Sequence, residues 1–288
     1  MHFFAKARSQ AKSHWSNCIS YFVTVPKYWA VFSLSIQQEL YYRESFLMER
    51  VRSLTVIIAF YAFWSAIFQG RDQFLGYSKS QMFTYVLGMN ILRALVFSDK
   101  TWELMREINT GKISSYLIRP ISYIGFCLSR DAADKATQFL SSILEVALAV
   151  WIFKIPLYIP ASFLTLAAFA LTLTLAIVLY FLMSYWVATF AFWTSESAGP
   201  RFCFELFMEF SSGAFFPLDV LPKMVQTVFG VLPFASLLFF PLNVFLERIT
   251  GTDFLKGLLI QVFWIAVFAW TARKVWNKGL KAYGAEGG

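Results

Sequence analysis

Four charged residues lie inside long apolar stretches of the sequence, where they could bind a ligand or join neighbouring helices. Glu145 lies in "SSILEVALAVWIF", Arg93 lies in the apolar run before Ser98, and Glu205 and Glu209 follow "SAGPR". An ionised group in such surroundings is costly unless it is paired, protonated or hydrated. Glu145 could therefore contact a cationic ligand, pair with Arg93 or cross-link helices, and the sequence leaves all three interpretations open.

Each of the other three charged residues has two interpretations. The Arg93 guanidinium could extend to the headgroups at the cytoplasmic surface, or it could pair with an acidic group inside a helix bundle. Glu205 and Glu209 are four residues apart, so they share one face of a helix. Glu205 would lie in the first turns, where the helix dipole favours an anion, and Glu209 would lie deeper. Both could line a path for a ligand or contact a second membrane subunit.

The residues that most enzymes use are missing from these apolar stretches. The only two histidines, His2 and His14, lie in the N-terminal tail, so a buried serine nucleophile would lack its usual base. HExxH and GxxxxGK[ST] do not occur, and Cys18, Cys127 and Cys203 are far apart with no CxxC pair. We therefore expect no metal, no cofactor and no catalysis in this chain alone. Any uphill transport would need a partner or an ion gradient.

The composition is that of an integral membrane protein. Of the 288 residues, 58% are hydrophobic and only 15% are charged, whereas a soluble domain is typically about a quarter charged. The basic residues behind the net charge of +8 flank the apolar runs, which suits anchoring to anionic lipid better than nucleic-acid binding. The first twenty residues are polar and basic, so we expect no cleaved signal peptide.

Six apolar runs could cross a bilayer as helices, for which about 20 residues are needed. They predict an all-α, polytopic membrane protein with spans at residues 54–68, 81–97, 137–155, 163–193, 202–216 and 255–270. If the N-terminus is cytoplasmic, 18 Lys and Arg residues fall on the cytoplasmic side and six on the other. Because cytoplasmic loops are enriched in these residues, we expect both termini inside, in the inner (plasma) membrane of a bacterium.

Residues 27–45 form neither a plain span nor a plain loop. Trp29, Phe32, Ile36 and Leu40 recur at helical spacing, while polar residues occupy other faces. This pattern predicts an amphipathic helix that lies in the cytoplasmic interface. An ordinary first span is the weaker alternative, because the run is too polar.

Residues 211–247 are apolar but are interrupted by two glycines and four prolines. Proline interrupts helices, and irregular backbone at membrane depth is tolerated only inside protein or beside water. The segment therefore predicts short re-entrant helices before the last span. One additional full span is the alternative.

Three segments resemble those of a known family. They are "REINTGKISSYLIRPIS" at residues 106–122, "SSGAFFPLDVLP" at residues 211–222 and the "LPF…P" run from Leu232 to Pro241. With the interfacial helix and the basic loop, they make the chain from about residue 28 to 283 similar to an ABC-2-type permease. Such a permease is the membrane subunit of an ATP-binding-cassette exporter. The resemblance implies six spans per subunit, a second permease that is the same or different, and two docked ATPase subunits that bind ATP and Mg²⁺.

The basic loop contains the segment that the resemblance assigns to motor coupling. Ser98 can cap a helix there, Met105 and Ile108 contribute to one apolar edge, and Gly111 can end it. In the family, such a coupling helix docks on the ATPase and transmits the closing movement of the ATPase subunits to the membrane spans. A solvated extension of the second span is the alternative. The residues assigned to ATPase coupling are Trp102, Glu103, Arg106, Glu107, Gly111, Lys112, Arg119 and Pro120.

The resemblance also implies a translocation path among the spans. Phe215 and Phe216 precede Pro217 and could form an outer aromatic gate or simply face lipid. Acidic and aromatic residues would suit amphiphilic or cationic drug-like compounds, including by cation–π contact, and lipid or glycan export is also compatible. The candidate path residues are Arg93, Glu145, Glu205, Glu209, Phe215 and Phe216.

The sequence indicates one permease domain at residues 27–283, between a basic cytoplasmic tail at 1–26 and a short tail at 284–288. Two other classes of function stay open beside the ATP-driven exporter. A gradient-driven secondary transporter or channel would act without an ATPase and would depend on protonation of Glu145. A membrane scaffold would need none of the missing chemistry.

Overall fold

The computed structural model describes residues 25–41, 43–98, 100–117, 122–194 and 198–283. Most of them are helical, which confirms the all-α prediction apart from one hairpin of β1 (Gln73–Phe74) and β2 (Tyr77–Ser78). The predicted tails lie almost wholly outside the described residues. The helices are α2 (Val25–Tyr41), α3 (Arg43–Ile67), α4 (Lys79–Val96), α5 (Lys100–Asn109), α6 (Ile113–Leu117), α7 (Tyr123–Phe153), α8 (Phe163–Ala188), η1 (Thr189–Phe192), α9 (Ala198–Ser211), η2 (Leu218–Val220), α10 (Lys223–Val231), α11 (Phe239–Phe245) and α12 (Gly251–Ala282).

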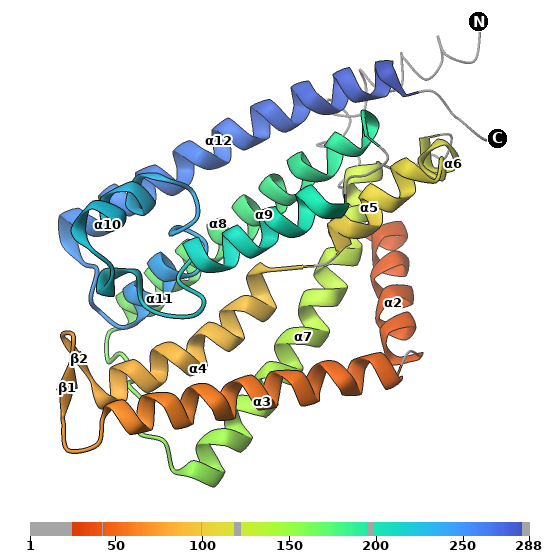
Figure 1. The fold of residues 1–288 in the computed structure, drawn as a ribbon. Coiled ribbons are helices and arrows are strands. Elements are labelled where there is room, and N and C mark those ends of the chain that lie inside the picture. Colours follow the sequence, from red (N-terminus) through yellow and green to blue (C-terminus); the bar gives the residue numbers. More distant parts are fainter. Residues whose placement is uncertain (1–24, 42, 99, 118–121, 195–197, 284–288) are drawn as a thin grey trace, which may run out of the picture.

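The long helices form a bundle with two different ends (Figure 1). α3, α4, α8, α9 and α12 run in roughly the same direction, and α7 crosses them obliquely. α5 and α6 lie at one end, whereas the hairpin, α10 and α11 lie at the other. α2 lies across the α5 end and packs mainly on α7. The loop predicted for ATPase coupling and the segment broken by glycine and proline are therefore at opposite ends of the bundle.

Three helices are long and apolar enough to cross a membrane: α7, α8 continued by η1, and α12. α3 and α4 carry polar residues within their length. α9 has 14 residues, about 21 Å at about 1.5 Å per residue, against a hydrocarbon core of about 30 Å. Among the described residues, these three helices match three of the six predicted spans, and the other three spans stay predictions.

Two helices begin well before the apolar runs that predicted them. α7 begins at Tyr123 rather than at residue 137, and α3 begins at Arg43 rather than at residue 54. The added part of α7 carries charged side chains that pair with one another, since Lys135 Nζ lies 2.7 Å from Asp131 Oδ2 one turn away. A helix tolerates such charges when partners at i and i+4 share a face, whereas a search for apolar runs excludes them.

A cluster of aromatic rings joins α12 to α7 and η1 at the α5 end. The Trp276 side chain is fully buried, and its ring centroid lies 5.8 Å from that of Tyr123 and 5.5 Å from that of Phe192. Gly279 permits this approach, because a Cβ at that position would lie 2.2 Å from Phe192 Cδ2. The α5 end thus has its own hydrophobic core, separate from the larger one that includes residues of α4, α8 and α11.

The segment at residues 211–247 folds into short elements. η2, α10 and α11 contain three, nine and seven residues, so none of them can cross a bilayer as a helix. The chain therefore does not form one additional full span here. Gly213, with φ +84°, turns the chain after α9, and its carbonyl accepts a hydrogen bond from Tyr85 Oη at 2.8 Å. The depth of these helices in a membrane stays a prediction.

Tyr77 ties the hairpin to this segment. Its hydroxyl donates to Asp219 Oδ2 at 2.9 Å, and the Arg248 guanidinium lies 3.6 Å from its ring centroid. Arg248 Nη2 also lies 2.9 Å from the same carboxylate. Burial, reinforced by Asp219, raises the pKa of Tyr77 well above its ordinary value, so the hydroxyl stays a donor. The hairpin, η2 and the loop before α12 form one connected end.

Candidate functional site

α5 has the boundaries that its sequence predicts. The Ser98 hydroxyl accepts a hydrogen bond from the Lys100 backbone N–H at 3.2 Å. Gly111 follows the helix with φ +76°, a conformation that L side chains rarely adopt. α4 ends at Val96, so α5 is a separate helix of ten residues and not an extension of α4.

The apolar edge of α5 faces the interior of the protein. Leu104, Met105 and Ile108 are each less than 5% exposed and belong to the core that contains Trp276. Trp102 packs at the edge of this core, and its indole Nε1 donates to Glu205 Oε2 of α9 at 2.9 Å. A soluble partner that docks on α5 would therefore meet a different face from the predicted apolar edge.

Ion pairs hold a second face of α5 against α7 and α2. Glu103 contacts Arg130 of α7, and Glu107 Oε1 lies 3.3 Å from the same guanidinium. Tyr123 Oη donates to Glu107 Oε2 at 2.5 Å, and Glu107 is only 9% exposed. Lys100 Nζ lies 3.3 Å from Glu39 Oε1, which connects α5 to α2. Two of the predicted coupling residues, Glu103 and Glu107, are therefore internal anchors of α5.

The solvent-facing surface at this end is basic. Arg106, Thr110 and Lys112 are exposed, and Gly111 is half-buried. Arg119 and Pro120, the last two predicted coupling residues, lie outside the described residues. The exposed predicted coupling residues thus cluster at the C-terminal end of α5 and in the turn that follows.

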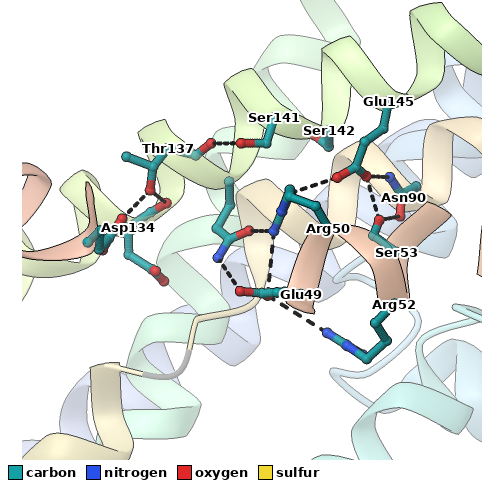
Figure 2. A network of polar contacts seen from close by, with 12 residues as sticks. Glu49, Arg50, Arg52, Ser53, Asn90, Asp134, Thr137, Ser141, Ser142 and Glu145 are labelled. Carbon is teal, nitrogen blue, oxygen red and sulfur yellow. Dashed lines mark hydrogen bonds and ion pairs between the residues drawn. The ribbon is translucent and has the colours of Figure 1, made fainter. Parts of the chain in front are cut away.

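Glu145 is the centre of a buried polar network that joins three helices (Figure 2). Its Oε1 lies 3.0 Å from Arg50 Nη1 of α3, and its Oε2 accepts from Ser53 Oγ at 2.5 Å. Asn90 of α4 approaches the same Oε2 at 3.5 Å and accepts from Ser53 at 3.3 Å. Glu145 therefore cross-links helices, with Arg50 rather than Arg93 as its cationic partner, and a contact with a ligand stays a prediction.

The network continues along one face of α7 toward α2 and α5. Gln138 accepts from Arg50 and donates to Glu49 Oε2 of α3 at 3.1 Å. Thr137 donates to Glu39 of α2, the residue that also contacts Lys100 of α5. We refer to this face as the α7 polar stripe, with the members Asp134, Thr137, Gln138, Ser141, Ser142 and Glu145. Figure 2 labels all of these residues except Gln138.

Arg93 pairs with Glu209 of α9, which decides between its two interpretations in favour of an acidic partner inside the bundle. Its guanidinium also lies 5.8 Å from the ring centroid of Phe215. Arg93, Asn90 and Phe215 help to line a cavity of about 30 Å³. Phe216 is half-buried beside Pro217. The predicted path residues Arg93, Glu209 and Phe215 thus come together, whereas Glu145 lies in the neighbouring network.

Glu205 belongs to a separate group at the α5 end of α9. Arg201 Nη2 lies 2.6 Å from Glu205 Oε1, and Arg201 is fully buried. Its Nη1 donates to the Ser184 carbonyl of α8 at 3.0 Å, and its guanidinium lies 5.8 Å from the Trp102 ring. Glu205 therefore connects α5, α8 and α9 and does not share the surroundings of Glu209.

Sequence reasoning missed three arginines that pair with glutamates inside the protein. They are Arg50 with Glu145, Arg130 with Glu103 and Glu107, and Arg201 with Glu205. Arg201 and Glu205 are four residues apart on one helix, and that spacing was a usable signal. Arg50 and Glu145 are 95 residues apart, so only the packing of α3 on α7 reveals their pairing.

The comparison with protein families gives one match. A family model described as "ABC-2 family transporter protein" matches residues 54–287, most of the chain. The match covers α5, the α7 polar stripe, Arg93 and Glu209, and begins after Arg50 and Ser53. No curated protein matches the sequence.

Proposed function

Because this chain belongs to the ABC-2 transporter family, a family of membrane transport components, we propose that it is the permease subunit of an ATP-driven exporter. In this proposal the α5 end is cytoplasmic and contacts a separate ABC ATPase that binds ATP and Mg²⁺. A second permease, either another copy of this chain or a related one, completes the translocation path.

The observation that carries this proposal is the two-sided character of α5. Its apolar edge and its two glutamates bind α7, α9 and the core beneath, whereas Arg106 and Lys112 face outward. A helix of this kind can receive a force on its outer surface and transmit it inward, because its inner contacts are buried and specific. This geometry supports the coupling role that the family resemblance implies.

Two routes lead inward from α5. One passes from Trp102 to Glu205 on α9. The other passes from Lys100 through Glu39 to Thr137, and so along the α7 polar stripe to Glu145 and the α3–α4 pair. We expect closure of the ATPase pair to shift α5 and, by these contacts, to move α9 and α3–α4 relative to one another. That movement would switch the path between inward and outward access.

The Glu145 carboxylate lies beside Arg50 and accepts a hydrogen bond from Ser53, so these contacts join α7 to α3. A gradient-driven transporter is the alternative function, and it would act without an ATPase. The compounds best suited to the aromatic and polar residues near Arg93 are amphiphilic.

Cysteine crosslinking to a co-purified ATPase tests the proposal. In a background without Cys18, Cys127 and Cys203, we expect Arg106→Cys and Lys112→Cys to crosslink to the ATPase. Met105→Cys is the matched control, because its side chain is buried next to Arg106 and should not react. The complex should also show vanadate-sensitive ATPase activity and ATP-dependent uptake into inverted vesicles. Absence of crosslinks at both exposed positions, with an intact complex, would remove the coupling role.

A further inference from the structure

All three carboxylates in the predicted spans have an arginine partner. The pairs are Glu145 with Arg50 at 3.0 Å, Glu205 with Arg201 at 2.6 Å, and Glu209 with Arg93. A simple cation that binds one of these acids must displace the arginine and leave it without a counter-ion. Removing one partner of a buried ion pair is strongly unfavourable, because the other charge stays desolvated and uncompensated. The pairing therefore argues against a simple cation as the ligand.

The Arg93–Glu209 pair differs from the other two in its exposure and position. Both of its side chains are 26% exposed, whereas each of the other pairs has one nearly buried partner. Glu145 is 6% exposed beside Arg50 at 15%, and Arg201 is 0% exposed beside Glu205 at 24%. Arg93 also lines the cavity between α3, α4 and the residues that follow α9. Of the three pairs, this is the one in which both charges are about one quarter exposed and one of them lines this cavity.

The cavity next to Arg93 combines apolar walls with polar groups. Phe60 of α3 and Phe215 contribute rings, and Asn90 contributes an amide. A cavity of about 30 Å³ holds about one water, so a larger occupant must displace lining side chains, among which Phe215 is a candidate. That ring packs against Phe210 at a centroid distance of 4.9 Å. The site thus offers aromatic surface for an apolar chain, with two opposite charges at its edge.

We infer that Arg93 and Glu209 form a subsite for the zwitterionic headgroup of an amphiphile. Its anionic group binds Arg93 and its ammonium group binds Glu209, so neither charge loses its counter-ion when the pair separates. A cation satisfies Glu209 alone, and an anion satisfies Arg93 alone. The inference rests on the proposed function, since it names the class of compound that the permease binds.

The test compares headgroups on one apolar chain. Dodecyl betaine, dodecyltrimethylammonium, dodecanoate and dodecanol share the dodecyl chain and differ in charge. Each competes, below its micelle-forming concentration, with radiolabelled dodecyl betaine on the full-length permease in nanodiscs, with empty nanodiscs subtracted. We expect the betaine to bind at least about tenfold more tightly than the other three, a difference of about 1.4 kcal/mol. Discrimination smaller than about threefold would overturn the inference.

Charge-removing variants give opposite shifts in preference. Arg93→Gln should move the preference toward the ammonium compound, and Glu209→Gln should move it toward the carboxylate. If either single variant fails to fold, the double variant Arg93→Gln/Glu209→Gln replaces it in the binding assay, because removal of both charges leaves neither of them unpaired. That double variant should bind dodecanol as the wild type does and lose its preference for the betaine. A double variant that keeps the preference would refute the subsite.

The matched control is a double variant of an exposed pair on α12, Asp253→Asn/Lys256→Gln, whose side chains are each 72% exposed. It should bind all four compounds as the wild type does. Nanodiscs of phosphatidylcholine or of phosphatidylglycerol distinguish the source of the zwitterion. Weaker betaine binding in phosphatidylcholine indicates that a membrane lipid occupies the site, and equal binding indicates a compound other than this lipid. Because the assay contains no ATPase, its result is independent of the crosslinking test.

Discussion

Arg50 of α3 and Glu145 of α7 are 95 residues apart in sequence, yet their side chains meet at 3.0 Å inside the bundle. Arg50 is 15% and Glu145 is 6% exposed, so water can replace little of this interaction. Ser53 and Asn90 satisfy the other carboxylate oxygen, which makes the carboxylate a junction of α3, α4 and α7. Loss of either partner should therefore destabilise the protein, because water cannot solvate the charge that remains buried.

Arg50→Met should destabilise the protein by about 3 kcal/mol, because it leaves the Glu145 carboxylate buried without its cation. The double variant Arg50→Met/Glu145→Leu should recover most of that loss, since it removes both charges. Unfolding in mixed micelles with a rising fraction of dodecyl sulfate measures the free energies. Lys256→Gln, at an exposed position, should change stability by less than about 0.5 kcal/mol. A double variant as unstable as the single one would show that the ion pair is not the cause.

Trp102→Phe should loosen α5 without unfolding the bundle. The change removes the indole N–H that donates to Glu205, and a hydrogen bond to a charged group contributes about 1.5–3 kcal/mol. Hydrogen–deuterium exchange of peptides within α5 should accelerate about tenfold or more, while peptides within α8 keep their protection. Trp151→Phe, on the exposed surface of α7, is the control and should leave both regions unchanged. Equal exchange in α5 before and after the Trp102 change would contradict the prediction.

Gly279→Ala should destabilise the α5 end by about 1–3 kcal/mol, because overpacking forces neighbouring groups apart. The added Cβ would lie 2.2 Å from Phe192 Cδ2, so η1 must move away from α12. Gly230→Ala is the matched control, since a Cβ there meets nothing within 4 Å and alanine favours the α10 helix by about 1 kcal/mol. Thermal unfolding midpoints should fall for the first variant and stay equal or rise for the second. The reverse order would show that the contact between α12 and η1 is not tight.

The Tyr158–Glu247 hydrogen bond should stabilise the loops at the α10 end only within a window of pH. Tyr158 Oη donates to Glu247 Oε2 at 2.5 Å, and Thr165 donates to Oε1 at 3.0 Å. These bonds, that of Tyr158 first, lower the pKa of Glu247. The contribution is therefore present above the ordinary glutamate pKa of about 4.3 and is lost as pH falls through the lower folded value.

At high pH the titration of Tyr158 limits the stability that the same hydrogen bond contributes. The hydrogen bond to Glu247 raises the pKa of Tyr158, so the contribution is present below the ordinary tyrosine pKa of about 10 and is lost as pH rises through the folded value. The thermal midpoint of Tyr158→Phe should lie below that of the wild type at neutral pH and converge with it beyond both limits. Glu247→Gln should show the same convergence at low pH. A difference that does not vary with pH would refute the role of the hydrogen bond.

The positions of several local features follow from the sequence, because their causes are local. Ser98 and Gly111 delimit α5 through a cap and a left-handed turn, and both act within a few residues. The apolar runs that predict spans place α7, α8 and α12, which are long and apolar enough to cross a membrane. They predict the first residue of α7 and the last residue of α12 less well. α7 and α12 continue into charged segments, and in α7 the partners Asp131 and Lys135 are one turn apart.

By itself, the sequence determined the membrane class, the helical architecture, the family resemblance and the presence of four costly charges. Only the tertiary structure decided which polar and charged groups meet between helices. Arg93 meets Glu209 across 116 residues, and Trp102 meets Glu205 across 103. Local propensity carries no information over such separations, because the contacts depend on which faces of α3, α4, α5 and α9 the packing of the bundle brings together. The physical reason is the apolar surroundings: each buried charge must find a partner, and the fold determines which partner is within reach.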